Sequence, residues 1–314
     1  MSVSELSARV ASRSARIGVV GLGAVGVAVA AAFAGAGFAV VGVDVDPSRV
    51  ANLGAEDEPD LAELLATVIQ SGRLVATTDF AALAEADVVL VAVATPVIDR
   101  RPDLSALTLA CESITSVAKD GALVIVESTL PPGTCERVLA PILGARLHLG
   151  HAPERVMPTR RLANLRRVPR MCGAASREIA EAMATLYATI GDGRIDRTDW
   201  LTAELAKTAE NTYRDVNIAF ANELAAICEA HGADFRAVRE LVNRSPGRDV
   251  LLAGPGVGGA CLPKDPWLLV AGAGAPTPLV AAARAVNDAM PSRVVAKLEE
   301  TLGVLEGARI VLLG

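Results

Sequence analysis

The segment Ile17–Asp44 constrains the fold of this chain more than any other segment. It runs from a β-branched stretch through a glycine turn and an alanine-rich stretch to a second β-branched stretch with an acid at its end. Gly21, Gly23 and Gly26 fit the spacing G-x-G-x-x-G, in which glycines permit a tight turn, leave room for a pyrophosphate and let helix and strand pack closely. This order predicts a dinucleotide-binding strand–helix–strand unit.

The acid at the end of the second predicted strand indicates which dinucleotide is bound. Asp44 follows Gly26 by 18 residues, which suits a carboxylate that accepts hydrogen bonds from the two adenosine ribose hydroxyls. Because an acid there repels a 2′-phosphate, the sequence favours NAD over NADP as the cofactor.

The same apolar run has an alternative interpretation as a signal peptide or membrane-spanning helix. No charged residue lies between Arg16 and Asp44. Seven glycines stand where turns would fall, however, and they divide the run into short pieces. The mean hydropathy of +0.40 then reflects parallel strands covered on both faces and alanine-rich helices, and no membrane association is expected.

Composition narrows the class of protein. The 314 residues suggest two domains. A net charge of −6 without a basic stripe, and 3% aromatic residues, argue against a nucleic-acid partner. Five cysteines without paired spacing argue against a disulfide framework or a metal site and favour the reducing cytoplasm.

Further strand-like runs alternate with helical stretches, which predicts an α/β fold with a doubly wound parallel sheet. These runs are Leu74–Thr77, Asp87–Ala94, Ala122–Glu127, Leu147–Gly150 and Arg170–Gly173. Ligands of such sheets bind at the carboxyl ends of the strands. Polar residues beside prolines follow three of these ends, at Thr95–Pro96, Glu127–Thr134 and His151–Arg155, although ordinary turn chemistry explains such residues equally well.

After residue 196 the pattern changes to one long helix, at about Asp199–His231, with an apolar face and no internal glycine or proline. A helix of this length commonly joins domains or supports a dimer, so we expect a homodimer through it. Lys207 and Asn211 lie four residues apart and share one helix face. A solvated lysine remains the alternative interpretation of that pair.

The glycine-rich segment Gly254–Asp265 places Cys261 just before Lys264 and Asp265. Glycines allow backbone amides to approach a substrate, and a nearby ammonium favours the thiolate that attacks carbonyl carbon. A surface loop with an inert cysteine is the alternative. The dinucleotide fingerprint upstream favours the nucleophile.

From Arg16 to its last residue the chain resembles the UDP-glucose/GDP-mannose dehydrogenase family, whose members oxidise C6 of a nucleotide sugar to a carboxylate. The resemblance rests on the dinucleotide fingerprint and on Thr95–Pro96 with Pro102–Ser105, Ser128–Thr134, Pro153–Val156, Ala203–Lys207 with Asn211, and Gly258–Asp265. The form of Pro153–Val156 is closer to the branch that acts on UDP-N-acetylhexosamines, such as UDP-N-acetyl-D-mannosamine and UDP-N-acetylglucosamine, than to the UDP-glucose branch.

The resemblance implies a set of binding residues for NAD and for a UDP-sugar. The NAD contacts it implies are Gly21, Gly23, Ala24, Val25, Gly26, Asp44, Arg49, Thr95, Thr129 and Lys264. The sugar contacts it implies are Glu154, Arg155, Lys207, Asn211, Arg248 and Gly258. The pathway it implies is nucleotide-sugar metabolism for polysaccharide biosynthesis.

The resemblance also implies catalytic roles. Lys207, with Asn211 and a water held by Asp265, would transfer the proton and stabilise the oxyanion as the alcohol loses its first hydride. Cys261 would then capture the aldehyde as a thiohemiacetal and be left as a thioester. Thr129 and Glu154 would orient the water that hydrolyses the thioester.

The expected domains are a tail over residues 1–15, a Rossmann domain over 16–196, an all-α central and dimerisation domain over 197–303, and the first strand of a third, nucleotide-binding domain over 304–314. We therefore expect a chain that lacks most of the family's C-terminal domain. Two other functions remain open. One is a β-hydroxyacid dehydrogenase that transfers a single hydride, and the other is an inactive dinucleotide-binding remnant.

Overall fold

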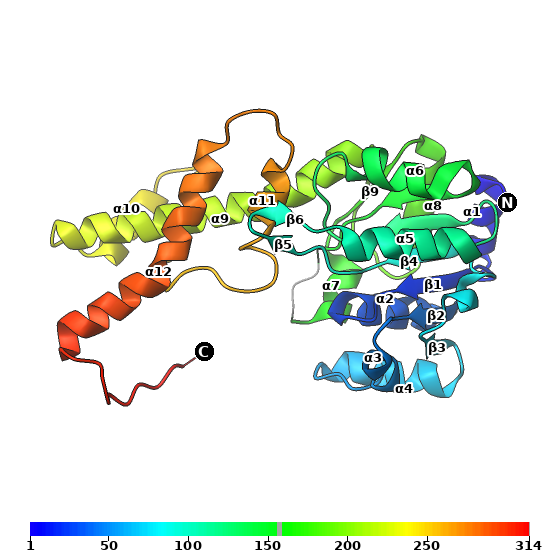
Figure 1. Cartoon of the computed structure of the whole chain (residues 1–314), viewed down its shortest axis with the longest axis horizontal. Helices are drawn as coiled ribbons and strands as arrows, with labels where there is room; N and C mark the ends of the chain where they lie inside the picture. Colours follow the sequence, from blue (N-terminus) through cyan, green and yellow to red (C-terminus); the bar gives the residue numbers. More distant parts are fainter. Residues whose placement is uncertain (156–158, 314) are drawn as a thin grey trace. The chain divides into compact units, whose positions relative to one another are not determined.

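The computed structural model describes residues 1–155 and 159–313, which form two compact units, Met1–Thr208 and Ala209–Gly314 (Figure 1). The boundary falls inside helix α9 (Trp200–Ala230), later than the change expected after residue 196. The first turns of this helix belong to the sheet-containing unit, because their side chains form hydrogen bonds with residues of that unit. The Trp200 indole donates to the Leu149 carbonyl oxygen at 3.2 Å.

The first unit contains a sheet of eight strands in the order β10-β9-β8-β7-β4-β1-β2-β3. Their bounds are β1 (Arg16–Val20), β2 (Ala39–Val43), β3 (Leu74–Thr77), β4 (Val88–Val91), β7 (Leu123–Val126), β8 (His148–His151), β9 (Arg170–Ala174) and β10 (Ile195–Thr198). The α/β class with a Rossmann-type sheet is therefore confirmed. The edge strand β10 was not predicted, because its residues are too polar to form an apolar run.

The direction of β9 departs from the sequence prediction. Strands β3, β2, β1, β4, β7 and β8 pair in parallel, but β9 runs antiparallel to β8 and β10 is parallel to β9. In the antiparallel pair His151 lies opposite Gly173. The beginning of β9, rather than its end, therefore lies at the carboxyl edge of the sheet.

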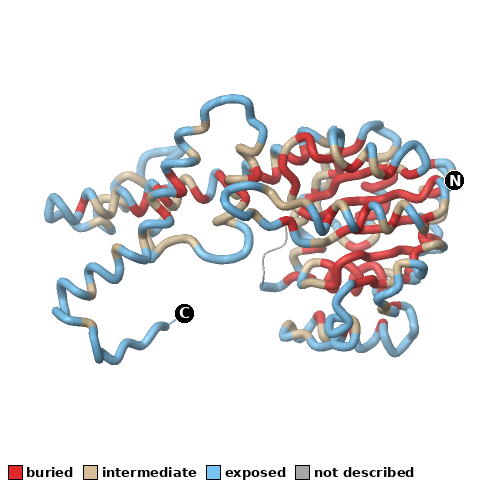
Figure 2. The backbone as a smooth tube through the Cα atoms, viewed as in Figure 1, coloured by how far each residue is buried: buried red, intermediate tan, exposed pale blue. Residues whose placement is uncertain are grey.

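Alternate residues of the central strands enter two separate cores. In β4, Val88 and Leu90 join one buried cluster, while Val89 and Val91 join the other, as the two-residue period of a strand requires. Figure 2 shows these strands as buried along their length. The helices of this unit are α1 (Val3–Ala11), α2 (Ala24–Gly35), α3 (Pro47–Ala51), α4 (Pro59–Gln70), α5 (Ser105–Val117), α6 (Ala140–Leu143), α7 (Arg161–Arg167) and α8 (Arg177–Tyr187).

Short elements complete the first unit. A two-stranded antiparallel hairpin joins β5 (Val97–Ile98) and β6 (Arg101–Pro102). A π-helical turn covers Cys135–Leu139, and 3₁₀ turns cover Phe80–Leu83 and Gly144–Arg146.

Residues 1–15 were expected as a tail, but α1 is a packed helix. Val3, Leu6 and Val10 are buried, and the helix contacts α8. These residues follow the three- and four-residue spacing of an amphipathic helix. Ser2 accepts a hydrogen bond from the Glu5 backbone amide and thereby caps its beginning.

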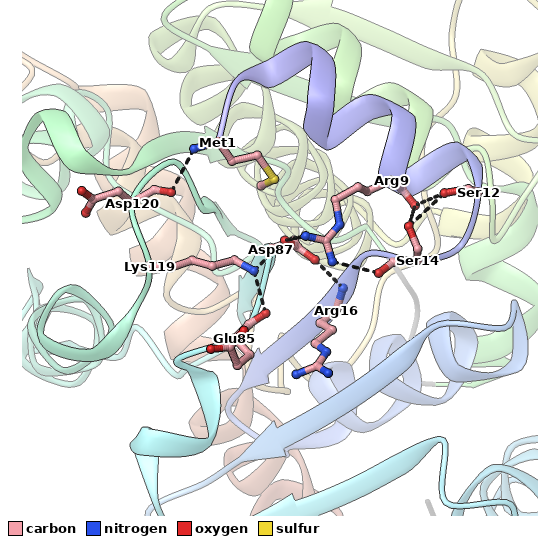
Figure 3. Close-up of polar contacts among 9 residues, drawn as sticks. All are labelled: Met1, Arg9, Ser12, Ser14, Arg16, Glu85, Asp87, Lys119 and Asp120. Carbon is pink, nitrogen blue, oxygen red and sulfur yellow. Dashed lines mark hydrogen bonds and ion pairs between the residues drawn. The ribbon is translucent and has the colours of Figure 1, made fainter.

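A buried aspartate also ties α1 to the sheet. Figure 3 shows Asp87, just before β4, between the side chains of Arg9 and Lys119. The carboxylate lies 3.0 Å from the Arg9 guanidinium and 2.8 Å from the Lys119 ammonium, and it accepts the Arg16 backbone amide at 2.8 Å. The charge of Asp87 is thus compensated although its side chain is fully buried.

The second unit is helical, and no strand occurs in its described residues 209–313. It contains the rest of α9 with α10 (Phe235–Asn243), α11 (Asp265–Val270) and α12 (Pro278–Leu302). A buried polar network joins α9 to α12. Arg284 donates to Asp215 at 2.6 Å, and the Asn287 amide donates to the same carboxylate at 2.9 Å.

Two sequence expectations concern residues near the end of the chain and Val156. Residues 304–313, expected to hold the first strand of a third domain, form no strand, since a strand needs a neighbour to accept and donate its backbone hydrogen bonds. Residues 310–313 are exposed. Val156 and Gly314, which belonged to expected motifs, lie outside the described residues.

The alternative of a membrane-spanning helix requires a helix that is long and apolar enough. Within residues 1–155 and 159–313, no helix has the length and apolarity needed to cross a membrane. The uncharged run after Arg16 divides instead into β1, α2 and β2.

Candidate active site

The glycine turn after β1 has the geometry that a dinucleotide pyrophosphate requires. Gly21 adopts a φ of +92°, and a Cβ atom there would lie 2.6 Å from the Ala92 carbonyl oxygen. A Cβ at Gly26 would lie 1.8 Å from the Gly21 carbonyl oxygen, so neither position tolerates a side chain. Gly23 is the N-cap of α2 and supplies no capping side chain, so the first amides of this helix, at Ala24 and Val25, are available to an anion.

Asp44 lies beside this turn at the end of β2. Its carboxylate accepts the Leu22 amide at 2.7 Å and the Asp46 amide at 2.9 Å, and Arg49 Nη1 lies 3.5 Å away. These bonds hold the carboxylate in one orientation at a pocket of about 320 Å³. Asp44, Arg49 and Gly21 line this pocket with the apolar ends of β1 and β2, the apolar residues that follow β4 and residues of α5, which suits an adenosine.

An arginine that the sequence analysis missed lies at the same turn. Arg161 Nη1 donates to the Ala24 carbonyl oxygen at 3.1 Å, while the guanidinium pairs with Glu56 and Glu58. Its charge is thus already compensated by two carboxylates. Arg161 connects the segment after the expected Glu154–Arg155 motif to the helix that carries the glycine turn.

Hydroxyl groups join the loops after β4 and β7. Thr95 Oγ1 donates to the Thr129 carbonyl oxygen at 2.8 Å, and Ser128 Oγ donates to the Val93 carbonyl oxygen at 2.6 Å. From α9, Glu204 accepts the Gly133 amide at 2.5 Å in the same loop. The expected residues Thr95 and Thr129 are therefore brought together at the carboxyl edge of the sheet.

Glu154 belongs to a buried charge cluster. Its Oε1 accepts the Arg155 amide at 2.7 Å, and its Oε2 lies 2.9 Å from Arg170 Nη1. Glu127 lies 3.8 Å from the same nitrogen and accepts the Tyr187 hydroxyl at 2.7 Å. Burial, followed by the negative charge of Glu154, raises the pKa of Glu127 to about 7.

Glu127, Arg170 and Tyr187 were not predicted as site residues. Glu127 appeared only as the last residue of a predicted strand and the first residue of the motif that follows it, and Arg170 appeared only as the start of a strand expected to be parallel. The one available sequence signal was a pair of charged residues, Glu127 and Arg170, at the ends of apolar strands.

Lys207 lies near His151 in the interior of the first unit. Lys207 is 8% exposed, and no ion pair to it occurs among the described residues. His151 is fully buried at the end of β8 and its Nδ1 contacts the Val126 carbonyl oxygen at 2.9 Å. Burial, with a smaller effect of the Lys207 charge, lowers the pKa of His151 to about 4, so the imidazole beside Lys207 is neutral.

In the helical unit, three expected residues contact Asp265, which is itself an expected site residue. Asp265 is fully buried; Asn211 Nδ2 donates to its Oδ2 at 2.5 Å, and Lys264 Nζ contacts its Oδ1 at 2.6 Å. The Asp265 amide donates to the Cys261 carbonyl oxygen at 2.9 Å. Cys261 is exposed, whereas the other four cysteines are buried.

The remaining expected substrate contacts are on the loops of the helical unit. Arg248 donates to the Pro246 carbonyl oxygen at 2.9 Å, and nothing lies within 4 Å of a Cβ added at Gly258. The glycine-rich segment is held at its start, because the Gly254 amide donates to Asn222 at 2.9 Å and Asn222 in turn donates to Asn287. This connects the segment that carries Cys261 to α9 and α12.

A strand–turn–helix dinucleotide site, a mostly parallel sheet and a helical unit define a dinucleotide-dependent dehydrogenase. The first part, residues 15–191, matches the NAD-binding domain of the UDP-glucose/GDP-mannose dehydrogenase family, and residues 201–289 match its central domain. This chain belongs to that family, and NAD is its cofactor.

Individual relatives agree with this assignment. The chain is 39% identical over 296 residues to a UDP-N-acetyl-D-mannosamine dehydrogenase of Methanocaldococcus jannaschii, covering 91% of this chain and 68% of that protein. It is 37% identical to an NDP-N-acetyl-D-galactosaminuronic acid dehydrogenase of Ralstonia nicotianae, covering 90% of this chain and 71% of that protein. Among solved structures, a UDP-D-ManNAc dehydrogenase of Pyrococcus horikoshii superposes with a TM-score of 0.87 at 38% identity, covering 94% of this chain and 72% of that one.

The β-hydroxyacid alternative shares only the fold. A Mycobacterium tuberculosis 3-hydroxyisobutyrate dehydrogenase gives a TM-score of 0.66 at 20% identity over 92% of this chain and 99% of that one. Identity this low supports similar architecture and carries no argument about chemistry.

Proposed function

We propose that this chain oxidises C6 of a nucleotide sugar from the alcohol to the carboxylate, with a thioester on Cys261 as intermediate. The observation that carries the proposal is the Asp265 carboxylate, held between Asn211 and Lys264 beside the backbone of the one exposed cysteine. A single hydride transfer needs no cysteine, whereas a four-electron oxidation must retain the intermediate aldehyde.

When bound, NAD would supply the hydride acceptor for each of the two oxidations. The residues that would hold it are the amides at the beginning of α2 for the pyrophosphate and Asp44 for the adenosine ribose. The Asp44 carboxylate fits two hydroxyl donors, because backbone amides fix its orientation. Thr95, Thr129 and Lys264 complete the proposed cofactor contacts.

In the first oxidation, we propose that Lys207 and Asn211 assist the loss of the hydroxyl proton and stabilise the oxyanion. The C6 hydroxyl loses its proton as its carbon loses a hydride, which leaves an aldehyde. A buried ammonium stabilises the developing oxyanion more strongly than a solvated one does. Neutral His151 adds no competing charge beside Lys207.

In the second oxidation, Cys261 Sγ bonds to the aldehyde carbon to give a thiohemiacetal. Loss of a hydride and a proton converts this to a thioester. Water then adds to the acyl carbon, the bond between carbon and sulfur breaks, and the electron pair returns to Cys261. Glu154 would accept the proton of this water, and Thr129 would orient it.

The substrate class we propose is a UDP-N-acetylhexosamine. Relatives named for UDP-N-acetyl-D-mannosamine and for NDP-N-acetyl-D-galactosaminuronic acid support an N-acetylated sugar over UDP-glucose. Glu154, Arg155, Lys207, Asn211, Arg248 and Gly258 are the contacts proposed for it. A nucleotide-linked uronate made in the cytoplasm would serve polysaccharide biosynthesis.

We also propose a homodimer through α9. Tyr213, Phe220 and Ile227 recur every seven residues and therefore lie on one helix face, and they are 73%, 56% and 50% exposed. An exposed apolar row of this kind is unusual on a monomer and fits the same face of a second copy.

The stoichiometry of NADH tests the proposed chemistry. The purified chain is incubated with NAD and a panel of UDP-sugars, and NADH formed is divided by sugar consumed. Two NADH per sugar, with a uronate as product, is the expected result. One per sugar would make the chain a simple alcohol dehydrogenase, and none would make it an inactive dinucleotide-binding protein.

A further inference from the structure

Beneath Glu154, three buried side chains form a connected cluster outside the site residues assigned so far. Tyr187 on α8 donates to Glu127 at 2.7 Å, and the Arg170 guanidinium lies over the Tyr187 ring, 4.3 Å from its centroid. Arg170 Nη1 in turn lies 2.9 Å from Glu154 Oε2. All four side chains are buried, and they connect α8, β7, β9 and the loop after β8.

The antiparallel direction of β9 creates this cluster. His151 pairs with Gly173, and continuing that register by three residues brings Arg170 opposite Glu154. A parallel β9 would place Arg170 at the other edge of the sheet. Backbone bonding fixes the other side, because the Glu154 amide donates to the Glu127 carbonyl oxygen at 3.1 Å.

The two carboxylates of the cluster lie at different distances from the Arg170 guanidinium. Arg170 is closer to Glu154, at 2.9 Å, than to Glu127, at 3.8 Å. Glu127 therefore has the weaker ion pair with Arg170, and this longer distance together with its burial favours its protonated form.

The groups that face Glu127 are Glu154, Arg170, Tyr187 and Cys172. Burial and Glu154 raise the pKa of Glu127 to about 7, while Arg170 and the Tyr187 hydrogen bond oppose the increase. Burial raises the pKa of Cys172 to about 12, so this neighbouring thiol remains neutral.

We propose that Glu127, with Arg170 and Tyr187, is a positioning group that keeps Arg170 against Glu154 and so holds the Glu154 carboxylate in one orientation for hydrolysis of the Cys261 thioester; this rests on the function proposed above. In that step water forms a bond to the acyl carbon, its proton passes to Glu154, and the electrons of the broken bond return to sulfur. At a pH above the pKa of Glu127, the ionised Glu127 carboxylate competes with Glu154 for Arg170. The hydrolysis rate should therefore change near neutral pH.

Pre-steady-state kinetics between pH 5.5 and 8.5 test the proposal. A burst of NADH reports the oxidations that precede hydrolysis, and the following steady rate reports hydrolysis where that step limits turnover. For the wild type we expect an inflection of the steady rate at about pH 7. Glu127→Gln mimics the protonated acid, so it should keep the low-pH rate and abolish the inflection.

Tyr187→Phe is a second variant, for which the direction of the change in the pH profile can be predicted. Loss of the hydroxyl removes a bond that favours ionised Glu127, so the inflection should move to higher pH. Glu181→Gln is the matched control, because Glu181 lies on the same helix, is 46% exposed and pairs only with Arg177 and Arg197 among the described residues. It should leave the profile unchanged.

A measurement without substrate separates failure of this proposal from failure of the proposed function. Because the folded-state pKa of Glu127 is raised, its contribution to stability is full below pH 4.5 and is lost as the pH rises through about 7. Unfolding of wild type and Glu127→Gln should therefore diverge over that window. Divergence without an NADH burst would overturn the function alone, whereas parallel stability curves, or an inflection retained in Glu127→Gln, would overturn the positioning role.

Discussion

Asn211 on α9 donates a 2.5 Å hydrogen bond to Asp265, 54 residues further along the chain. Lys264 contacts the other oxygen of the same carboxylate. A fully buried carboxylate with an amide and an ammonium as partners fixes the beginning of α11 against α9, and the loop that presents Cys261 ends at that point.

Asp265→Ala should lower the free energy of unfolding by about 3 kcal/mol, because it leaves Lys264 and Asn211 without their shared partner. Urea titration followed by circular dichroism measures this loss. Asp249→Ala, at an exposed position of the same unit, should change stability by less than about 0.5 kcal/mol. Equal effects of the two substitutions would contradict the role of Asp265.

NAD should bind at least about tenfold more tightly than NADP, because Asp44 would repel a 2′-phosphate. Asp44→Asn should reduce this preference, while Asp46→Asn, which removes a nearby exposed charge, should not. Isothermal titration of the wild type and both variants with both dinucleotides gives the six dissociation constants. Tighter binding of NADP by the wild type would rule out Asp44 as the ribose contact.

Cys261→Ala should abolish uronate formation but retain reduction of the 6-aldehyde by NADH, since that reverse step needs no thiol. Lys207→Ala should slow both reactions by about a hundredfold, because its proposed role belongs to the alcohol–aldehyde step. Product analysis and NADH oxidation measure the two reactions. Acid formed at the wild-type rate by Cys261→Ala would disprove the thioester.

Alkylation of the native protein should modify one thiol, because Cys261 is exposed and Cys111, Cys135, Cys172 and Cys228 are buried. Activity should fall with that modification, and excess UDP-sugar should slow it. Mass spectrometry of peptides identifies the site. Inactivation of Cys261→Ala preparations in aldehyde reduction by the same reagent would point to a different thiol.

Phe220→Glu should weaken self-association at least about a hundredfold, because it places a charge in the exposed apolar row of α9. Arg214→Gln, which lies off that row, is the control. Sedimentation at several concentrations reports the oligomeric state. A wild-type protein that is monomeric throughout would exclude this dimer.

His151 should make stability fall on acidification. Its folded-state pKa is lowered to about 4 from 6.5, so its contribution is present above pH 6.5 and is lost as the pH falls through about 4. The opposite contribution of Glu127 overlaps this window, so each is measured as a difference from its own variant. His151→Gln should lack the acid-side loss, which is about 3 kcal/mol at most, and His231→Gln, at an exposed position, should retain it.

The sequence alone determined the features that depend on local spacing. The glycines from Gly21 to Gly26 and the acid at Asp44 are close along the chain, so their geometry follows from one turn and one helix. The apolar runs predicted most of the strands, and the uninterrupted helical pattern predicted α9. Covalent proximity leaves few alternatives at this range, so pattern and structure agree.

Only the tertiary structure decided which distant residues meet. The direction of β9 depends on the strand beside which it pairs, and the apolar sequence from Arg170 is the same for either direction. The antiparallel choice brings Arg170 to Glu154 and Glu127, and helix packing brings Asn211 to Asp265. Such contacts depend on how whole helices and strands pack, and no short sequence pattern identifies the partner residue.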